Sequence, residues 1–168
     1  MELISLTHGL FAQVDDSDFE YLNQWGWFAY KQKNTYYAVR NCQITKRKRT
    51  IIRMHRLILG LQNPKIFCDH IDHNGLNNQR SNLRKATPAQ NLANRSASLN
   101  STSKYLGVSL STVSNKYGSI YTYWKAAIQK DGHVIHIGRF KTEDQAAIAY
   151  NEAAIKIHGD FANPNIIK

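Results

Sequence analysis

The sequence contains little cysteine and no long hydrophobic run. Its two cysteines, Cys42 and Cys68, stand far apart and form no Cys-x-x-Cys pair. They cannot build a disulfide framework or a four-cysteine zinc site. The first residues lack a basic region followed by an apolar stretch, and no segment is apolar enough to span a bilayer. We therefore expect reduced thiols, no structural zinc, no membrane association and a cytoplasmic location.

Acidic residues are also scarce. The chain of 168 residues has 22 Lys and Arg against 12 Asp and Glu, which gives a formal net charge of +10. A polyanion is the natural partner of such a protein, and nucleic acid is favoured over an acidic membrane. Because 42% of the residues are hydrophobic and 11% are aromatic, the composition is typical of a folded protein.

The N-terminal region is predicted to be rich in β-structure. Aromatic and β-branched runs at 3–6, 27–30, 36–40 and 50–54 are separated by polar turns, which is typical of short strands. The acidic cluster at 15–18 predicts the cap and first turn of a short helix. A run of four basic residues between two of these strands is either a solvated turn or a hairpin tip that binds a phosphate backbone, and it consists of Lys46, Arg47, Lys48 and Arg49.

The segment from Asp69 to Asn91 is rich in Asn, Asp, His and Gly, which does not suit the interior of a helix or sheet. Residues 66–68 and 83–86 can form two short strands around an Asn-Gly turn. Thr87, Pro88 and Gln90 then match a capping box that opens a helix. The pattern therefore predicts strand, loop, strand and helix, with Asn91 in the first helical turn.

A carboxylate, an amide oxygen and an imidazole in such a frame suit Mg²⁺ or another hard divalent ion. Hydrolysis of a phosphodiester needs a base that activates water and a cation that neutralises the developing charge. His70 can be that base, since neutral imidazole is abundant near pH 7. His55, in an aliphatic context, is interpreted as a structural residue, and the roles of Asp72 and His73 stay open.

The stretch resembles the catalytic motif of HNH homing endonucleases of phage and intron origin, which have a ββα-metal fold. The resemblance covers about residues 50–95. It implies Asp69 and Asn91 as metal ligands, His70 as general base, and Asn82 as the central residue that braces the loop and orients His70. Arg84 is a further candidate for DNA contact. Because the chain lacks the cysteine pairs of zinc-braced variants, packing must hold the motif.

A Ser- and Asn-rich stretch at 96–104 has a linker composition and predicts a domain boundary, with order gained only on DNA. Beyond it, β-prone runs at 107–110, 121–129 and 134–140 predict a three-stranded antiparallel sheet. A capping box at 142–145 opens a helix that runs to His158 with small residues on one face. One sheet face is then covered by this helix, and the other is free to bind DNA.

The C-terminal segment resembles the DNA-binding domain of plant ethylene-response factors. The positions where those domains read bases differ here, so their target cannot be transferred. The alternative for each candidate DNA contact is a solvated sheet residue, and the candidates are Lys116, Lys125, Gln129, His136 and Arg139.

The sequence thus predicts an α+β protein of three parts. Residues 1–95 form an HNH endonuclease domain with a β-rich N-terminal region, 96–104 a linker, and 105–168 a sheet packed on one helix. Our first hypothesis is a site-directed endonuclease of a homing or mobile element, in a bacterial or phage-infected cell. It would cut double-stranded DNA with one Mg²⁺ or Mn²⁺, without an obligatory protein partner. The alternative is a non-cleaving DNA-binding regulator that retains the HNH fold.

Overall fold

The computed structural model describes residues 1–32, 35–98 and 100–167, and its contacts divide the chain into two compact units. The first unit is Met1–Pro88 and the second is Ala89–Lys168. The division lies ahead of the segment 96–104 in which we predicted a linker. The predicted domains 1–95 and 105–168, with a linker between them, therefore stay a prediction.

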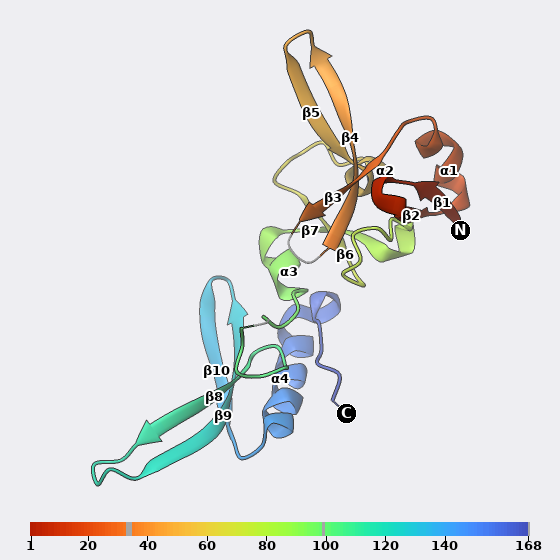
Figure 1. Ribbon diagram of the computed structural model, residues 1–168. Helices are drawn as coiled ribbons and strands as arrows, with labels where there is room; N and C mark the ends of the chain where they lie inside the picture. Colours follow the sequence, from red (N-terminus) through yellow and green to blue (C-terminus); the bar gives the residue numbers. More distant parts are fainter. Residues whose placement is uncertain (33–34, 99, 168) are drawn as a thin grey trace. The chain divides into compact units, whose positions relative to one another are not determined.

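The first unit combines three small antiparallel sheets with two short helices (Figure 1). A first hairpin precedes α1, a three-stranded sheet precedes α2, and a second hairpin closes the unit. Strands occur where β-branched or aromatic runs were predicted, although Met54 starts a helix rather than ending a strand. The elements are β1 (Glu2–Ser5), β2 (Phe11–Val14), α1 (Asp16–Asn23), β3 (Phe28–Gln32), β4 (Thr35–Thr45), β5 (Lys48–Arg53), α2 (Met54–Ile58), β6 (Phe67–His70) and β7 (Leu83–Ala86).

The core of the first unit lies where these sheets and helices meet. Leu22 of α1, Val14 of β2 and Met54 of α2 are fully buried within it. Leu83 at the start of β7 belongs to the same core, so the last hairpin is anchored to the rest of the unit. Burying aliphatic side chains of this size contributes about 1.5–3 kcal/mol each.

The acidic cluster at the start of α1 has a different role from the predicted cap. Asp15 is the N-cap residue by position, but its side chain makes no cap hydrogen bond. Its carboxylate instead accepts hydrogen bonds from the Gln79 side chain and from the Arg80 backbone N–H, at 3.3 and 2.8 Å. The cap prediction was therefore wrong for this side chain, because a distant loop occupies the acceptor.

The second unit is a three-stranded antiparallel sheet with α4 on one face (Figure 1). The sheet has three antiparallel strands, as predicted, and their order is β10-β9-β8. Thr142 caps α4 by accepting a hydrogen bond from the Gln145 N–H at 3.2 Å, which confirms the capping prediction. The elements are α3 (Pro88–Ala93), which begins at the last residue of the first unit, β8 (Val108–Ser114), β9 (Ile120–Lys130), β10 (His133–Phe140) and α4 (Glu143–His158).

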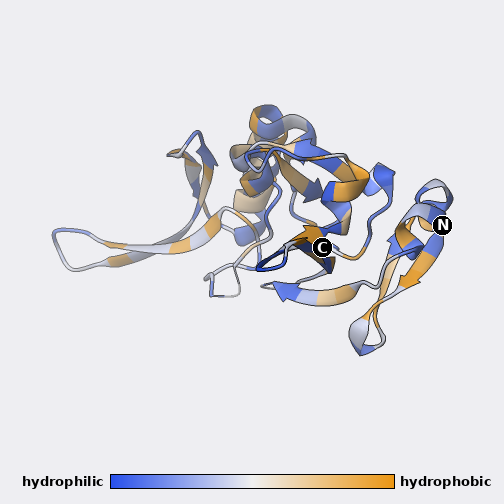
Figure 2. Cartoon of the chain, turned by 90° about the horizontal axis from the view of Figure 1, so that it is seen from above, coloured by the Kyte–Doolittle hydropathy of each residue, from blue (hydrophilic) through white to orange (hydrophobic). Residues whose placement is uncertain are grey.

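Alanines of α4 allow the helix to lie close to the sheet. Ala146, Ala147 and Ala154 are buried against Ala126 and Ile128 of β9. Figure 2 shows hydrophobic segments alternating with hydrophilic ones along the strands and helices. The core is thus built from small side chains and a few large ones.

One glycine fixes how closely the helix approaches. Gly107 has φ of 74°, and a Cβ added there would lie 2.1 Å from ring carbons of Tyr150. Only glycine adopts this backbone conformation without strain and leaves room for the ring. The Tyr150 ring of α4 therefore occupies the space that a side chain at residue 107, just before β8, would fill.

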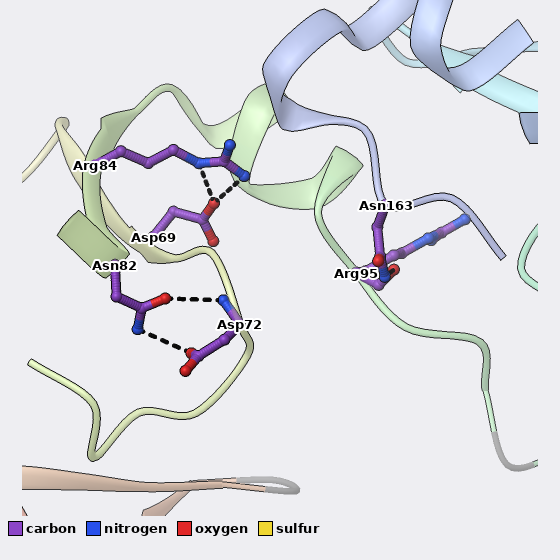
Figure 3. A network of polar contacts seen from close by, with 6 residues as sticks. All are labelled: Asp69, Asp72, Asn82, Arg84, Arg95 and Asn163. Carbon is purple, nitrogen blue, oxygen red and sulfur yellow. Dashed lines mark hydrogen bonds and ion pairs between the residues drawn. The ribbon is translucent and has the colours of Figure 1, made fainter. Parts of the chain in front are cut away.

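Two residues of the predicted linker, Ala97 and Ser103, pack within the second unit, whereas most of the other described linker residues are exposed. Ala97 packs against the core of this unit, and Ser103 is buried and donates a hydrogen bond to the Glu143 side chain at 2.6 Å. Asn163 donates to the Arg95 carbonyl at 2.9 Å (Figure 3). These contacts differ from the flexible linker that the composition predicts, because Ser side chains bond here to the helix start rather than to water.

In the described residues the fold is mixed, with four α-helices and several small sheets, in agreement with the predicted α+β class. Within the same residues, no helix has both the length and the apolar character needed to cross a membrane.

Candidate active site

The hairpin of β6 and β7 places the candidate residues. The two strands are antiparallel, with Asp69 opposite Arg84 and His70 opposite Leu83. Asp69 and His70 are the last residues of β6, and both are buried, with 6% and 5% of their surface exposed. The polar loop 71–82 connects the strands, so its shape decides what surrounds these two residues.

Asn82 holds this loop in a closed turn. Its side-chain oxygen accepts a hydrogen bond from the Asp72 N–H at 3.0 Å, and its amide donates to the Asp72 carboxylate and the Asn77 carbonyl, both at 2.8 Å (Figure 3). Asp72 in turn accepts from the Asn77 side chain and the Asn74 N–H. These hydrogen bonds lower the pKa of the Asp72 carboxyl, although its partial desolvation acts in the opposite direction.

A second asparagine contacts the imidazole of His70. The Asn78 side chain is fully buried, and its amide donates to the Leu76 carbonyl at 3.1 Å. This bond orients the amide so that Oδ1 lies 3.5 Å from Nε2 of His70. Because a carbonyl oxygen only accepts, the contact favours the His70 tautomer with its proton on Nε2. The lone pair then resides on Nδ1.

Two further rings pack against His70. The ring centroid of His55 is 5.0 Å away at an edge-to-face angle of 83°, and that of Tyr37 is 5.7 Å away. Burial lowers the pKa of His70, while the Asn78 contact and the charges of Asp72 and Asp69 raise it. The balance is a lowered pKa, so His70 is neutral near pH 7 and able to accept a proton.

His55 is a buried neutral imidazole. Burial, followed by the charge on His70, lowers the pKa of His55 to about 3. Its Nδ1 atom is buried without a hydrogen-bond partner in the described residues. The structural role predicted for His55 fits this position, but its contact with His70 was not predicted.

The carboxylate of Asp69 is paired with a cation of its own chain. Nε and an Nη atom of Arg84 lie 2.8 and 2.7 Å from the same carboxylate oxygen, Oδ2 (Figure 3). Both side chains are largely buried, with 16% of Arg84 and 7% of Asp69 exposed. The register explains the pair, since residues directly opposite each other in an antiparallel ladder share one face.

Helix α1 and strand β4 hold the loop from outside. Asp18 of α1 binds the Arg80 guanidinium through both carboxylate oxygens, at 2.8 and 2.7 Å. On the other side, a Cβ added to Gly75 would lie 2.4 Å from the Tyr36 carbonyl and 2.9 Å from the Tyr37 ring. The Gly75 N–H donates to the Thr35 hydroxyl at 3.1 Å. The motif is therefore held by polar bracing and close packing.

The donor chemistry at Asp69 fits a hard divalent ion better than zinc. Within the described residues, no three His, Cys, Asp or Glu side chains gather in a group that could hold a metal ion. Zinc takes three or four such ligands, whereas Mg²⁺ keeps several waters and needs only one or two carboxylates. Burial raises the pKa of the nearby Cys68 thiol to about 12, so this thiol is not a thiolate ligand. A carboxylate such as that of Asp69 is a ligand that Mg²⁺ takes.

The remaining candidates of the first unit lie on an exposed hairpin. The four basic residues from Lys46 to Arg49 form its tip, where β4 turns into β5 (Figure 1). All four are exposed, and Arg49 donates from Nε to the Gln43 side chain at 3.0 Å. The geometry leaves their charges open to a large anionic partner.

In the second unit, strand register brings four candidates onto one sheet face. Lys125 lies opposite Arg139, and His136 lies opposite Ala127. Gln129 follows Lys125 by four residues along β9, so all of these point away from the face that α4 covers. The Arg139 guanidinium lies 4.6 Å from the Tyr123 ring centre. Lys116 lies in the exposed turn between β8 and β9, and Asn91 lies in α3.

Besides the Asp69–Arg84 pair, four contacts of the site were not anticipated from the sequence. They are the Asn78–His70 contact, the ring packing of His55 and Tyr37 on His70, and the anchoring of Arg80 by Asp18. Asn78 stands among several loop amides, and nothing in their order indicates which one reaches His70.

The chain is similar to an uncharacterized HNH endonuclease of Acanthamoeba polyphaga mimivirus. The two are 40% identical over 121 residues, which cover 69% of this chain and 58% of the relative. The chain thus spans less than two thirds of the relative's length. No family model matches the chain, and no solved structure matches it. The similarity supports the HNH resemblance and leaves the ethylene-response-factor resemblance as a prediction.

Proposed function

We propose that the chain is a metal-dependent DNA endonuclease of the HNH type. The observation that carries the proposal is the Asp69–His70 pair at the end of β6, next to a loop closed by Asn82 and Asn78. The mimivirus relative, which is named an HNH endonuclease, supports the same activity. A Mg²⁺ or Mn²⁺ ion held by Asp69, and by Asn91 as the resemblance implies, would neutralise charge on the phosphate.

His70 is the general base of this proposal. Its Nδ1 takes a proton from the attacking water, a new phosphorus–oxygen bond forms, and the bond from phosphorus to one sugar oxygen breaks. Asn78 is a positioning residue, because its oxygen holds the proton of His70 on Nε2 and leaves Nδ1 as the acceptor. Asn82 acts on His70 only indirectly, because it closes the loop that carries Asn78.

Double-stranded DNA is the proposed substrate, and basic surfaces in both units would hold it. The hairpin tip from Lys46 to Arg49 provides four exposed charges. The open sheet face of the second unit provides Lys125, Gln129, His136 and Arg139, with Lys116 at the neighbouring turn. Contacts of Lys and Arg with phosphates release counterions, so the affinity should fall steeply with salt.

We further propose that the enzyme is site-directed and belongs to a homing or mobile element. The rival function is a DNA-binding regulator that does not cleave. The burial of His70 and the ion pair on Asp69 favour this rival, because both restrict access to the two residues. A cleavage assay decides between the two functions.

The experiment incubates supercoiled plasmid with the protein in Mg²⁺, in Mn²⁺ and in EDTA, and separates nicked from linear product. We expect cleavage in either metal and none in EDTA. His70→Ala should abolish cleavage, and Asp69→Ala and Asn91→Ala should lose it while still shifting duplex DNA in a gel.

The matched control is His73→Asn, which changes an exposed histidine of the same loop whose backbone is left-handed, with φ of 63°. Asn tolerates this conformation, so cleavage should change by less than about twofold. A wild-type protein that binds duplex but leaves plasmid intact in every metal would establish the regulator instead. Equal cleavage by His70→Ala would refute the base assignment.

A further inference from the structure

Arg84 was a candidate for DNA contact, and the structure ties it to Asp69. Two of its nitrogens lie within 2.8 Å of Asp69 Oδ2, and the pair is largely buried. A carboxylate removed from water is costly unless a cation accompanies it. The guanidinium therefore meets the same electrostatic need that a divalent ion would meet at this carboxylate.

We propose that Arg84 is an exchangeable counter-ion of Asp69, which neutralises the carboxylate in the absence of a metal and yields it when a divalent ion binds. This proposal rests on the proposed function, because it assumes that Asp69 is the metal ligand. Once displaced from Asp69, the Arg84 guanidinium would lie beside the ion, where the phosphate of the DNA is expected. Arg binds phosphate through two N–H groups, as it binds Asp69 here.

The geometry favours exchange over permanent bracing. Two nitrogens of Arg84, Nε and an Nη atom, converge on one oxygen, Oδ2. The two-oxygen arrangement occurs elsewhere in this unit, where Arg80 binds Asp18. Since a bidentate fork fixes orientation, the contact of both nitrogens with Oδ2 holds the Asp69 carboxylate in a less strictly defined orientation than the Arg80 fork holds Asp18. Lys85, the next residue, is exposed and lies opposite Cys68 rather than Asp69. It is therefore a basic neighbour that is not a counter-ion of Asp69 and can serve as a control.

The first test measures Mn²⁺ binding by electron paramagnetic resonance of the free ion. Arg84→Gln removes the competing charge, and its Mn²⁺ affinity should rise on the order of tenfold. The gain in Mn²⁺ affinity should vanish when Asp69→Asn is added, because the carboxylate for which Arg84 and the ion compete is then gone. An unchanged or weaker Mn²⁺ affinity in Arg84→Gln would overturn the proposal and make Arg84 a brace that positions Asp69.

A companion measurement covers the case in which Arg84→Gln unfolds without metal. Circular dichroism with and without Mn²⁺ should then show that the ion restores the fold, since it replaces the lost counter-ion. If Arg84→Gln fails to fold in either condition, Arg84→Lys is used. Lys keeps the positive charge but cannot donate two N–H groups from a planar guanidinium, so it should compete less well for Asp69. The Mn²⁺ affinity should therefore rise about threefold. No gain in that variant would contradict the exchange.

The second test measures binding to a labelled duplex, in a His70→Ala background that leaves the DNA uncut. In EDTA, Arg84 is occupied by Asp69, and Arg84→Gln should change the affinity by less than about twofold. In Mg²⁺, the same change should weaken binding about fivefold. Lys85→Gln is the matched control, with the same effect in both conditions. Equal losses for Arg84→Gln with and without Mg²⁺ would refute the release of Arg84.

The two proposals can fail separately. If wild-type protein leaves plasmid intact while Arg84→Gln gains Asp69-dependent Mn²⁺ affinity, the nuclease assignment fails and the counter-ion role stands. If plasmid is cut in Mg²⁺ while Arg84→Gln gains no Mn²⁺ affinity, the nuclease stands and the exchange is refuted.

Discussion

The loop between β6 and β7 and the sheet of the second unit are stabilised by different kinds of interaction. The loop 71–82 is closed by side-chain amides and carboxylates, with Asn82 and Asn78 at its centre. The sheet is held against α4 by apolar contacts among alanines, Ile128 and Tyr150. Hydrogen bonds depend on which atom donates and which accepts, whereas apolar packing depends mainly on volume.

The difference predicts two patterns of sensitivity. In the loop, a change of donor into acceptor at constant size should be costly, because a buried polar atom loses its partner. In the core between the sheet and α4 of the second unit, the contacts are apolar, so changes of shape should matter most. Trp25 and Trp27 report on the first unit and Trp124 on the second, so the two can be followed separately.

The largest effect is expected from Gly107→Ala. The new Cβ would lie 2.1 Å from the Tyr150 ring and 2.7 Å from the Ala127 carbonyl, at φ of 74°. Overpacking and a strained backbone should together reduce the free energy of unfolding of the second unit by about 3 kcal/mol or more. Urea denaturation followed by Trp124 fluorescence in a Trp25→Phe, Trp27→Phe background measures the loss.

Gly118→Ala is the matched control for this prediction. Gly118 has φ of 80°, but a Cβ added there meets nothing within 4 Å. It should cost about 1 kcal/mol from backbone strain alone. If both substitutions cost the same, close packing of Tyr150 on Gly107 does not limit the second unit.

Asn82→Asp tests the polar loop with an isosteric change. The carboxylate would place an acceptor against the Asp72 carboxylate and the Asn77 carbonyl, which now receive hydrogen bonds from the amide. Two acceptors facing each other in a site that is 8% exposed should cost the first unit about 2–3 kcal/mol. Thermal denaturation followed by Trp25 and Trp27 fluorescence measures the change.

Asn74→Asp makes the same chemical change in the same loop. The Asn74 side chain uses its oxygen to accept from the Leu76 N–H at 3.1 Å, and Asp keeps that acceptor. Stability should change by less than about 0.5 kcal/mol. Equal costs at both positions would mean that net charge, rather than the Asn82 contacts, decides the loss.

The two buried histidines should make the first unit sensitive to acid. The pKa of His55 is about 3 in the folded protein and 6.5 as an ordinary value. Between these values the unfolded chain binds the proton and the folded chain does not, so stability falls as pH falls below 6.5. The slope should be on the order of 1.4 kcal/mol per pH unit for this residue.

His55→Leu should lower the proton uptake on unfolding by about one between pH 6 and 4. Urea midpoints of the first unit measured across this range give the slope. His73→Asn, which changes an exposed histidine, should leave the slope unaltered. The same slope in wild type and His55→Leu would mean that His55 is not protected from protons in the folded unit.

The sequence predicted local elements well and the contacts between them poorly. Periodicity and caps located the strands of both units and the start of α4 at Thr142. Strand β2 and helix α2 were not predicted, because both are short and lack a strong period. The partners of Asp15 and Asp18 lie more than 60 residues away, at Gln79 and Arg80, and local pattern carries no information on such pairs.

The same limit applies within the candidate site. Asp69, His70 and Asn82 could be selected because residue type and order resemble a known motif. That Asn78 contacts His70 follows only from the packing of the loop on β2, where Asn78 N–H donates to the Gln13 carbonyl at 2.8 Å. Arg84 was selected by charge, and its partner became evident only from strand register.

Apart from the control variants, Ile128→Val is expected to have the smallest effect on stability. Ile128 is 3% exposed in the core of the second unit, and the change removes one methylene without touching a polar atom. Loss of that group should cost about 1 kcal/mol and leave the first unit unaltered. Asn82→Asp removes no heavy atom, yet the polar loop should lose more stability than the apolar core. A larger loss for Ile128→Val, measured by Trp124 fluorescence, would show that both units are limited by packed volume.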